Sequence, residues 1–146
     1  MTLATERIDD FRRRVNEFYD SLQLKNQELY LLPRADVEID DFSEINEELI
    51  DNLAKMEPFG NGNAEPILKI TEATVLSVRR MGADGQHVKL TLRDKNDVAL
   101  QMLAFNAPEE FFREVGDEVS VWFQPTVNEW QGMKSVEGRL LHISGV

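Results

Sequence analysis

The segment from residue 87 to residue 93 carries the clearest chemical pattern in the chain. Polar and aliphatic side chains alternate along it, in the order His87, Val88, Lys89, Leu90, Thr91, Leu92, Arg93. Because successive side chains of a β-strand point to opposite faces, the polar ones line a single outward face. Cationic groups in a row on such a face are suited to neutralising the phosphates of a nucleic acid.

Cationic and aromatic side chains also occur in two loops expected beside this strand. Arg79 and Arg80 stand at the entrance to one loop, and Trp130 and Lys134 stand in or beside the other. On an OB barrel these two loops border the binding surface. A positive groove with an aromatic side chain at its rim binds single strands by phosphate contact and base stacking. A second interpretation stays open, in which the strand simply has a solvated polar face and Trp130 covers the barrel end.

The chain is poor in residues that catalyse reactions or bind metals. His87 and His142 are its only histidines, and neither belongs to a cluster with metal-ligand spacing. The absence of cysteine excludes disulfides, thiolate metal sites and cysteine nucleophiles. The neighbouring carboxylates Asp40 and Asp41 are better explained as favourable charge at a helix start. We therefore predict no catalytic residue and no metal or cofactor in this chain.

The hydrophobic pattern from residue 67 onward predicts a small β-barrel. A short helix fits Pro108 to Val115, between the third and fourth strands, and this order is that of a five-stranded OB fold. In such a barrel we expect Phe105 to lie in the core and Trp122 to pack against the N-terminal helices. Turn-forming residues separate the five expected strands, which we place at about 67–80, 86–94, 98–106, 118–127 and 134–144.

The N-terminal residues predict two amphipathic helices and a short strand. Apolar residues at three- and four-residue steps indicate a first helix from about Glu6 to Leu24, capped by the preceding threonine. Alternation predicts a strand at about 35–40, and a second helix is expected from Ser43, as its N-cap, to Met56. The chain is thus expected to be mainly β with N-terminal helices, in the α+β class. Its expected parts are a two-helix appendage (1–56), a Pro/Gly connector (57–66) and an OB-fold domain (67–146).

The composition is that of a globular protein with unevenly distributed charge. Hydrophobic residues make up 42% of the chain, charged residues 29%, and the net charge is −11. No apolar run approaches the roughly 20 residues that cross a bilayer, and no signal-peptide pattern is present, so we expect a cytoplasmic protein. Residues 1–66 carry 16 acidic and 7 basic side chains, whereas residues 67–146 carry 11 and 9. The second half is therefore able to present a basic stripe despite the net charge.

Several motifs resemble those of one nuclease family. The stretch LAKMEPFGNGNAEPI, residues 53–67, resembles the segment that precedes the OB domain in the RecJ family of single-stranded-DNA-specific exonucleases, in the DHH phosphoesterase superfamily. Ala64 stands where that family usually has proline. The similarity continues, in the same order, through residues 80–82, 87–94, 104–106 and 128–132, and residues 8–12 resemble the last helix of the family's DHHA1 domain.

The resemblance implies that the chain is the C-terminal part of a RecJ-like nuclease, comprising the end of a DHHA1 domain and the OB domain. Such nucleases are 5′–3′ exonucleases of DNA repair and recombination, in which the barrel helps to grip the incoming strand. The Asp and His motifs that hold manganese or magnesium in the family are not found in this chain. The implied partners are single-stranded DNA, the upstream catalytic domains of the same nuclease, and a DNA-repair protein.

Two classes of function remain in competition. The leading interpretation is a non-catalytic module that binds single-stranded nucleic acid, in which Arg79, Arg80, His87, Lys89, Arg93 and Lys134 contact phosphates and Trp130 stacks on a base. The rival is a protein-interaction module, because an acidic chain also suits a basic protein partner. That module would use the OB groove or the acidic face formed by Glu44, Glu47, Glu48 and Asp51. An autonomous phosphoesterase is disfavoured by the missing catalytic motifs.

Overall fold

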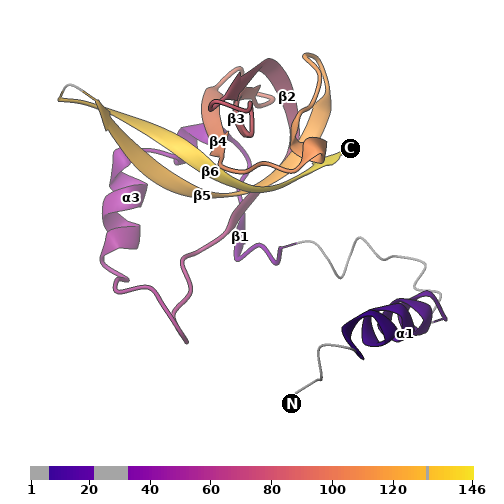
Figure 1. Ribbon diagram of the computed structural model, residues 1–146. Coiled ribbons are helices and arrows are strands. Elements are labelled where there is room, and N and C mark those ends of the chain that lie inside the picture. The colour runs from indigo at the N-terminus through magenta and orange to yellow at the C-terminus, as the bar shows by residue number, and fades with distance from the viewer. Residues whose placement is uncertain (1–6, 22–32, 131) are drawn as a thin grey trace. The chain divides into compact units, whose positions relative to one another are not determined.

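The computed structural model describes residues 7–21, 33–130 and 132–146, apart from the side chains of Asp9 and Trp130. The chain divides into two units, Met1–Leu32 and Pro33–Val146. The ribbon in Figure 1 shows the helix of the first unit and the strands of the second. None of the helices in the described part of the chain combines the length and apolar character that crossing a bilayer requires.

The first unit contains the helix α1, Ile8–Ser21. Its apolar side chains recur as predicted on one face, where Ile8, Phe11, Val15 and Phe18 are exposed. On the polar side, Arg13 forms ion pairs with Asp10 at 2.6 Å and with Glu17 at 2.9 Å. These pairs at three- and four-residue spacing support the helix locally. The predicted ends of this helix and its threonine cap lie outside the described residues.

The second unit is built on a closed ring of five strands. Each strand begins and ends within three residues of its predicted bounds: β2 Leu68–Met81, β3 His87–Arg93, β4 Ala99–Ala104, β5 Glu118–Trp130 and β6 Met133–Gly145. Neighbouring strands pair antiparallel, except that β4 and β6 are parallel, and β2 closes the ring by pairing with both β3 and β5. This is the strand order of an OB barrel, so the predicted fold class is confirmed.

The long strand β2 bends around the barrel by means of two irregularities. Its register with β3 shifts between Val75 and Ser77, and its register with β5 shifts between Ile70 and Ala73. Within the second shift, Glu72 has a φ of +60°, in the left-handed region. Bulges of this kind increase the local twist and let one strand serve both sides of a barrel, as expected for the first strand of this fold.

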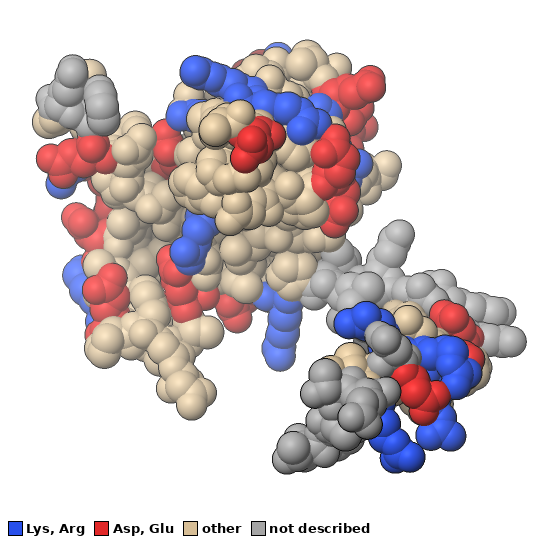
Figure 2. Space-filling view, viewed as in Figure 1, with Lys and Arg blue, Asp and Glu red and all other residues tan. Residues whose placement is uncertain are grey.

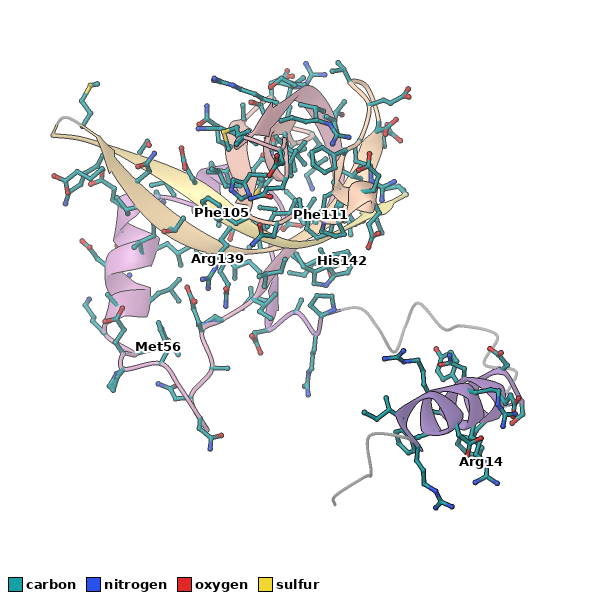
Figure 3. The ribbon with its side chains drawn as sticks, in the orientation of Figure 1. Arg14, Met56, Phe105, Phe111, Arg139 and His142 are labelled. Carbon is teal, nitrogen blue, oxygen red and sulfur yellow. The ribbon has the colours of Figure 1, made fainter. Side chains whose placement is uncertain are left out.

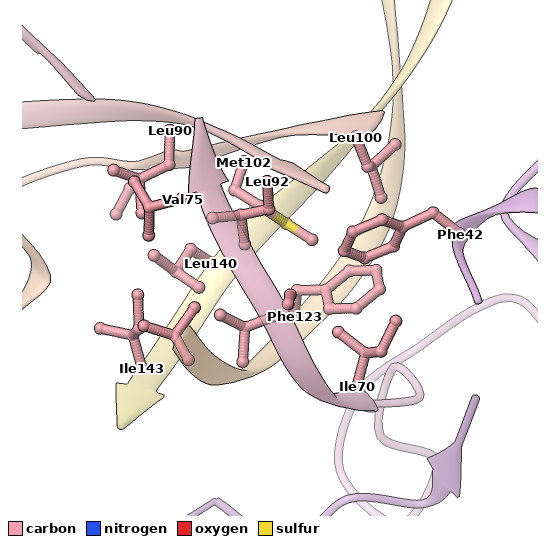
Figure 4. Close-up of a cluster of buried hydrophobic side chains, with 14 of the residues drawn as sticks. Phe42, Ile70, Val75, Leu90, Leu92, Leu100, Met102, Phe123, Leu140 and Ile143 are labelled. Atoms are coloured by element: carbon pink, nitrogen blue, oxygen red, sulfur yellow. The ribbon is translucent and has the colours of Figure 1, made fainter. Parts of the chain in front are cut away.

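Alternating side chains of all five strands fill the barrel. Val88, Leu90 and Leu92 of β3 are fully buried, as the sequence pattern predicts. A Cβ atom at Gly138 would overlap Sδ of Met102 and lie 3.0 Å from the Phe123 ring, so β6 needs glycine where it crosses the core. Figure 4 shows the central side chains of this cluster, among them Phe42, Ile70, Val75, Leu100, Leu140 and Ile143.

Residues 33–56 pack on the barrel and belong to the same unit. The strand β1, Val37–Glu38, runs parallel to the start of β2. Phe42 is buried and meets Phe123 edge to face, with ring centroids 6.4 Å apart. The buried carboxylate of Asp94 accepts the backbone N–H of Phe42 at 2.6 Å. The structure thus divides the chain at residue 32, whereas the sequence pattern places a boundary at residue 56.

Two expected helices are shorter than predicted. Residues 43–56 do not form one helix capped by Ser43: a 3-10 turn η2, Phe42–Glu44, capped by Asp41, precedes α3, Glu47–Ala54. Asn46 caps α3 by accepting the Leu49 N–H at 3.0 Å. The break arises because Ile45, between the two, is buried in the core. The helix expected at 108–115 is reduced to the 3-10 turn η3, Glu109–Phe111, in which Phe111 is buried.

A candidate nucleic-acid interface

The outward face of β3 extends over its neighbours β2 and β4. His87, Lys89, Thr91 and Arg93 alternate with the buried residues of β3 and are half-buried. Arg79 lies opposite Lys89 on β2, and Leu103 lies opposite it on β4. Arg139 follows as the partner of Leu103 on β6. We call this row of Arg79, Lys89, Leu103 and Arg139, together with His87, the barrel face.

Lys89 is held by a carboxylate within the barrel face. Its Nζ lies 3.1 Å from Oε1 of Glu137, and the Glu137 side chain is only 6% exposed. The Asn128 side-chain amide donates to the same oxygen at 3.4 Å. An ion pair with one partner this buried is screened little by water. The Lys89 ammonium is therefore fixed in position, and its charge is already matched in the free protein.

Arg79 and Lys134 are the cations that remain available. Both are exposed, and no ion pair joins either to any residue in the described part of the chain. Lys134 lies opposite Glu129 near the tip of the β5–β6 hairpin. Trp130 is paired with Met133 through its backbone, but its side chain lies outside the described residues. Its predicted stacking role stays a prediction.

The two other arginines of the predicted site point elsewhere. Arg80 forms an ion pair with Glu109 at 2.7 Å, and its guanidinium lies 3.6 Å from the centroid of the Phe112 ring, beside η3. Arg93 stands at the far end of β3, 3.3 Å from a carboxylate oxygen of Asp97. There it lines a polar cavity of about 470 Å³ that also includes Glu72 and Glu118. The structure therefore groups Arg79 with Lys89, and places Arg80 and Arg93 among acidic neighbours.

Arg139 and Glu137 were not singled out by the sequence pattern. Arg139 forms an ion pair with Glu65 at 2.6 Å and a hydrogen bond with Gln124. Both β6 residues reach the barrel face because β6 runs parallel to β4. No local sequence signal specifies this pairing, since it depends on closure of the barrel.

Phe105 is exposed, so its expected place in the core is wrong. Leu100, Met102 and Ala104 of β4 point inward, so the alternation of the strand directs residue 105 outward, where 65% of its surface is accessible. Phe105 is labelled in Figure 3. Its ring meets that of His87 edge to face, with centroids 5.2 Å apart. The alternation of β4 was the signal that could have found it.

Trp122 is buried between neighbouring strands. Its ring centroid is 5.2 Å from that of His142 on β6, and Nζ of Lys69 on β2 lies 5.4 Å from the ring. These two residues are also its backbone partners across the sheet. The aromatic contacts of Trp122 in the described structure are thus made by strands, whereas the sequence led us to expect the N-terminal helices.

A second surface of this unit is acidic and partly apolar. Glu44, Glu47, Glu48 and Asp51 are exposed on η2 and α3. Beside them lies a cleft of about 540 Å³, lined mainly by apolar side chains that include Val37, Leu49, Leu53, Met56 and Pro66. In Figure 2, acidic side chains predominate around α3, whereas several Lys and Arg side chains gather at the top of the barrel with acidic ones beside them. We call the acidic residues Glu44, Glu47, Glu48 and Asp51, together with this cleft, the α3 surface.

Comparison with known proteins places the second unit in a family. A family model described as the RecJ OB domain matches residues 35–142. The single-stranded-DNA-specific exonuclease RecJ of Bacillus subtilis (strain 168) is 30% identical over 135 residues, which cover 92% of this chain and 17% of that protein. The chain therefore spans less than a fifth of that relative.

Two solved structures share the fold. One is RecJ from Thermus thermophilus in complex with Mg²⁺, with a TM-score of 0.61, 19% identity, and coverage of 97% of this chain and 21% of that one. The other is the Mn²⁺ complex from the same organism, with a TM-score of 0.63, 19% identity, and coverage of 100% and 20%. The described residues of the present chain offer no group of three or more His, Asp or Glu side chains arranged to hold such an ion.

Proposed function

We propose that this chain is a non-catalytic module that binds single-stranded DNA within a RecJ-like 5′–3′ exonuclease of DNA repair and recombination. The chain belongs to the RecJ OB domain family, and this membership supports the proposal. The name of the B. subtilis relative supports single-stranded DNA as the ligand. The observation that carries the proposal is the barrel face on the outside of an OB barrel. There Arg79, which forms no ion pair with any residue that the structure describes, stands beside Lys89. The helix α1, whose residues 8–12 resemble the last helix of a DHHA1 domain, would belong to the end of that domain.

The barrel face would act as a clamp that guides the strand. Arg79, together with Lys134 of the neighbouring β5–β6 hairpin, would supply phosphate contacts without giving up an ion pair to any described residue. Lys89, in contrast, must share its charge with Glu137. His87 would add a contact at one end of β3. Arg80 and Arg93 would contact phosphates only by leaving their ion pairs with Glu109 and Asp97. With few cations free and a net charge of −11, binding should be weak and should weaken further with salt. Metal binding and hydrolysis would belong to other domains of the nuclease.

Fluorescence anisotropy with a labelled oligonucleotide at low salt tests the proposal. The double variant Arg79→Ala/Lys134→Ala should bind more weakly than the unmodified chain, and its slope of log K against log salt should be smaller by roughly 1.4, at about 0.7 per lost phosphate contact on a single strand. The matched control Arg34→Ala/Lys55→Ala removes the same charge from residues that lie neither on the barrel face nor in the β5–β6 hairpin. Equal binding by both double variants and the unmodified chain would contradict the assignment.

The α3 surface supports a second candidate function, protein interaction. Its apolar cleft lies beside exposed carboxylates, so it suits an amphipathic segment with basic flanks. A synthetic Leu/Lys amphipathic peptide is a suitable probe. Glu47→Lys/Glu48→Lys should weaken its binding and leave oligonucleotide binding intact. If the peptide does not bind the unmodified chain, this second function is excluded for that class of partner.

A further inference from the structure

Phe105 is a large aromatic side chain that the fold leaves in solvent but holds in place. It follows the last residue of β4, and its ring is in contact with the His87 ring at 5.2 Å, at an interplanar angle of 68°. This edge-to-face geometry is a favoured aromatic arrangement. The exposed 65% of its surface leaves ring area for another planar group. Phe105 therefore has the two properties of a stacking platform, access and support.

His87 is itself fixed from two sides. Its Nδ1 accepts the backbone N–H of Asn106 at 3.0 Å. Asn106 has a φ of +49°, the left-handed conformation that Asn tolerates better than most residues. On the other side, the β2–β3 loop approaches so closely that a Cβ atom at Gly82 would lie 3.1 Å from Cδ2 of His87. The imidazole is thus clamped between this loop and the turn that carries Phe105.

The aromatic pair lies one strand repeat from the cations. His87 and Lys89 are two residues apart on the outward face of β3, which corresponds to about 7 Å along the strand. Arg79 lies opposite Lys89. A base on the Phe105 ring would therefore lie close to cations that reach the neighbouring phosphates.

We infer that Phe105 forms a base-stacking site on the barrel face, with His87 as the residue that positions its ring. This inference rests on the proposed binding of single-stranded DNA, and it names the contact by which that site distinguishes a base from bare backbone. Stacking on an aromatic side chain accepts any base, because every base has a π-face. The site therefore recognises nucleobases in general and does not select one sequence.

The test compares a short oligo(dT) with a strand of equal length and charge built from abasic sites. The unmodified chain should prefer oligo(dT) by between about 5-fold and about 150-fold, the range that corresponds to one stacked base. Phe105→Ala and Phe105→Leu should remove this preference and leave affinity for the abasic strand unchanged. Phe105→Trp should keep it. His87→Asn, which offers an oxygen acceptor to Asn106 but no ring, should reduce the preference.

The outcomes separate this inference from the proposal on which it rests. If the unmodified chain binds neither strand, the proposed function is overturned and the stacking site with it. If it binds both strands equally, or if Phe105→Ala and Phe105→Leu keep the full preference, DNA binding stands and the stacking site is wrong. Trp130→Leu serves as the parallel aromatic variant. A preference lost only in Trp130→Leu overturns the assignment to Phe105.

Discussion

The barrel face and the α3 surface use their charged residues in opposite ways. On the barrel face, Lys89 is bound to the buried Glu137, and Arg139 is bound to Glu65. On the α3 surface, Glu47, Glu48 and Asp51 are exposed and form no ion pair with other residues that the structure describes. On the barrel face, carboxylates thus hold Lys89 and Arg139 in position, whereas the carboxylates of the α3 surface are solvated. Net charge alone describes neither surface.

Asp94 joins η2, which carries part of the α3 surface, to the turn that follows β3, and its removal should have the largest effect on stability. Its carboxylate accepts backbone N–H groups of Phe42 at 2.6 Å, Asn96 at 2.8 Å and Val98 at 2.9 Å. Asp94→Ala leaves these donors without an acceptor, which should cost about 3–5 kcal/mol of unfolding free energy. Urea denaturation measures the loss. Asp94→Asn, which keeps one oxygen acceptor but loses the second acceptor and the charge, should cost less. Equal stability of Asp94→Ala and the unmodified chain would exclude the anchoring role.

Removing Lys89 and removing Glu137 should have different effects on stability and on oligonucleotide affinity. Lys89→Met leaves a buried carboxylate uncompensated, so we expect a loss of about 2–3 kcal/mol in stability together with weaker oligonucleotide binding. Glu137→Gln leaves Lys89 without its partner, so oligonucleotide affinity should rise by roughly 3- to 10-fold, on the scale of about 1 kcal/mol for a charge contact. Denaturation and anisotropy on the same samples check both. A fall in affinity for Glu137→Gln would show that the carboxylate itself contributes to binding.

On the α3 surface, charge reversal should lower the stability of the helix slightly and leave oligonucleotide affinity nearly unchanged. Glu47 and Glu48 occupy the first turn of α3, where acid complements the helix dipole. Glu47→Lys and Glu48→Lys should each lower stability by about 0.3–1 kcal/mol. Oligonucleotide affinity should stay within about 2-fold, since the site lies on other elements. Thermal unfolding and anisotropy measure the two effects, and a large gain in affinity would show that this acid repels DNA at a distance.

The smallest expected effect is a change in the pKa of Asp41, the cap of η2. Hydrogen bonds from the Ser43 hydroxyl and then the Ser43 backbone N–H lower the pKa of Asp41 below its ordinary value of 3.8. A carboxylate with a lowered pKa stabilises the fold above the pKa of the unfolded chain, and this contribution is lost as the pH falls through the folded value. Ser43→Ala should therefore raise the pKa of Asp41 towards 3.8. An NMR titration of the Asp41 carboxyl measures this, and an unchanged midpoint would exclude the Ser43 hydroxyl as the cause.

The sequence alone determined the barrel and the inward and outward faces of its strands. The alternation at residues 87–93, the turn residues between strands and the strand order sufficed, because these signals are local and repeat with the period of the backbone. The same alternation, applied to β4, would also have placed Phe105 outside. The motifs of residues 53–67 and the later strands indicated the family.

Only the tertiary structure decided which charged side chains are available to bind a ligand and which are held in ion pairs. Lys89 and Glu137 are 48 residues apart, and they meet only because the closed barrel sets β6 parallel to β4. Burial of Phe42 and Ile45 in the same core divided the expected second helix and joined residues 33–56 to the barrel. Such contacts depend on the closure of distant strands rather than on neighbouring residues, so no local pattern encodes them.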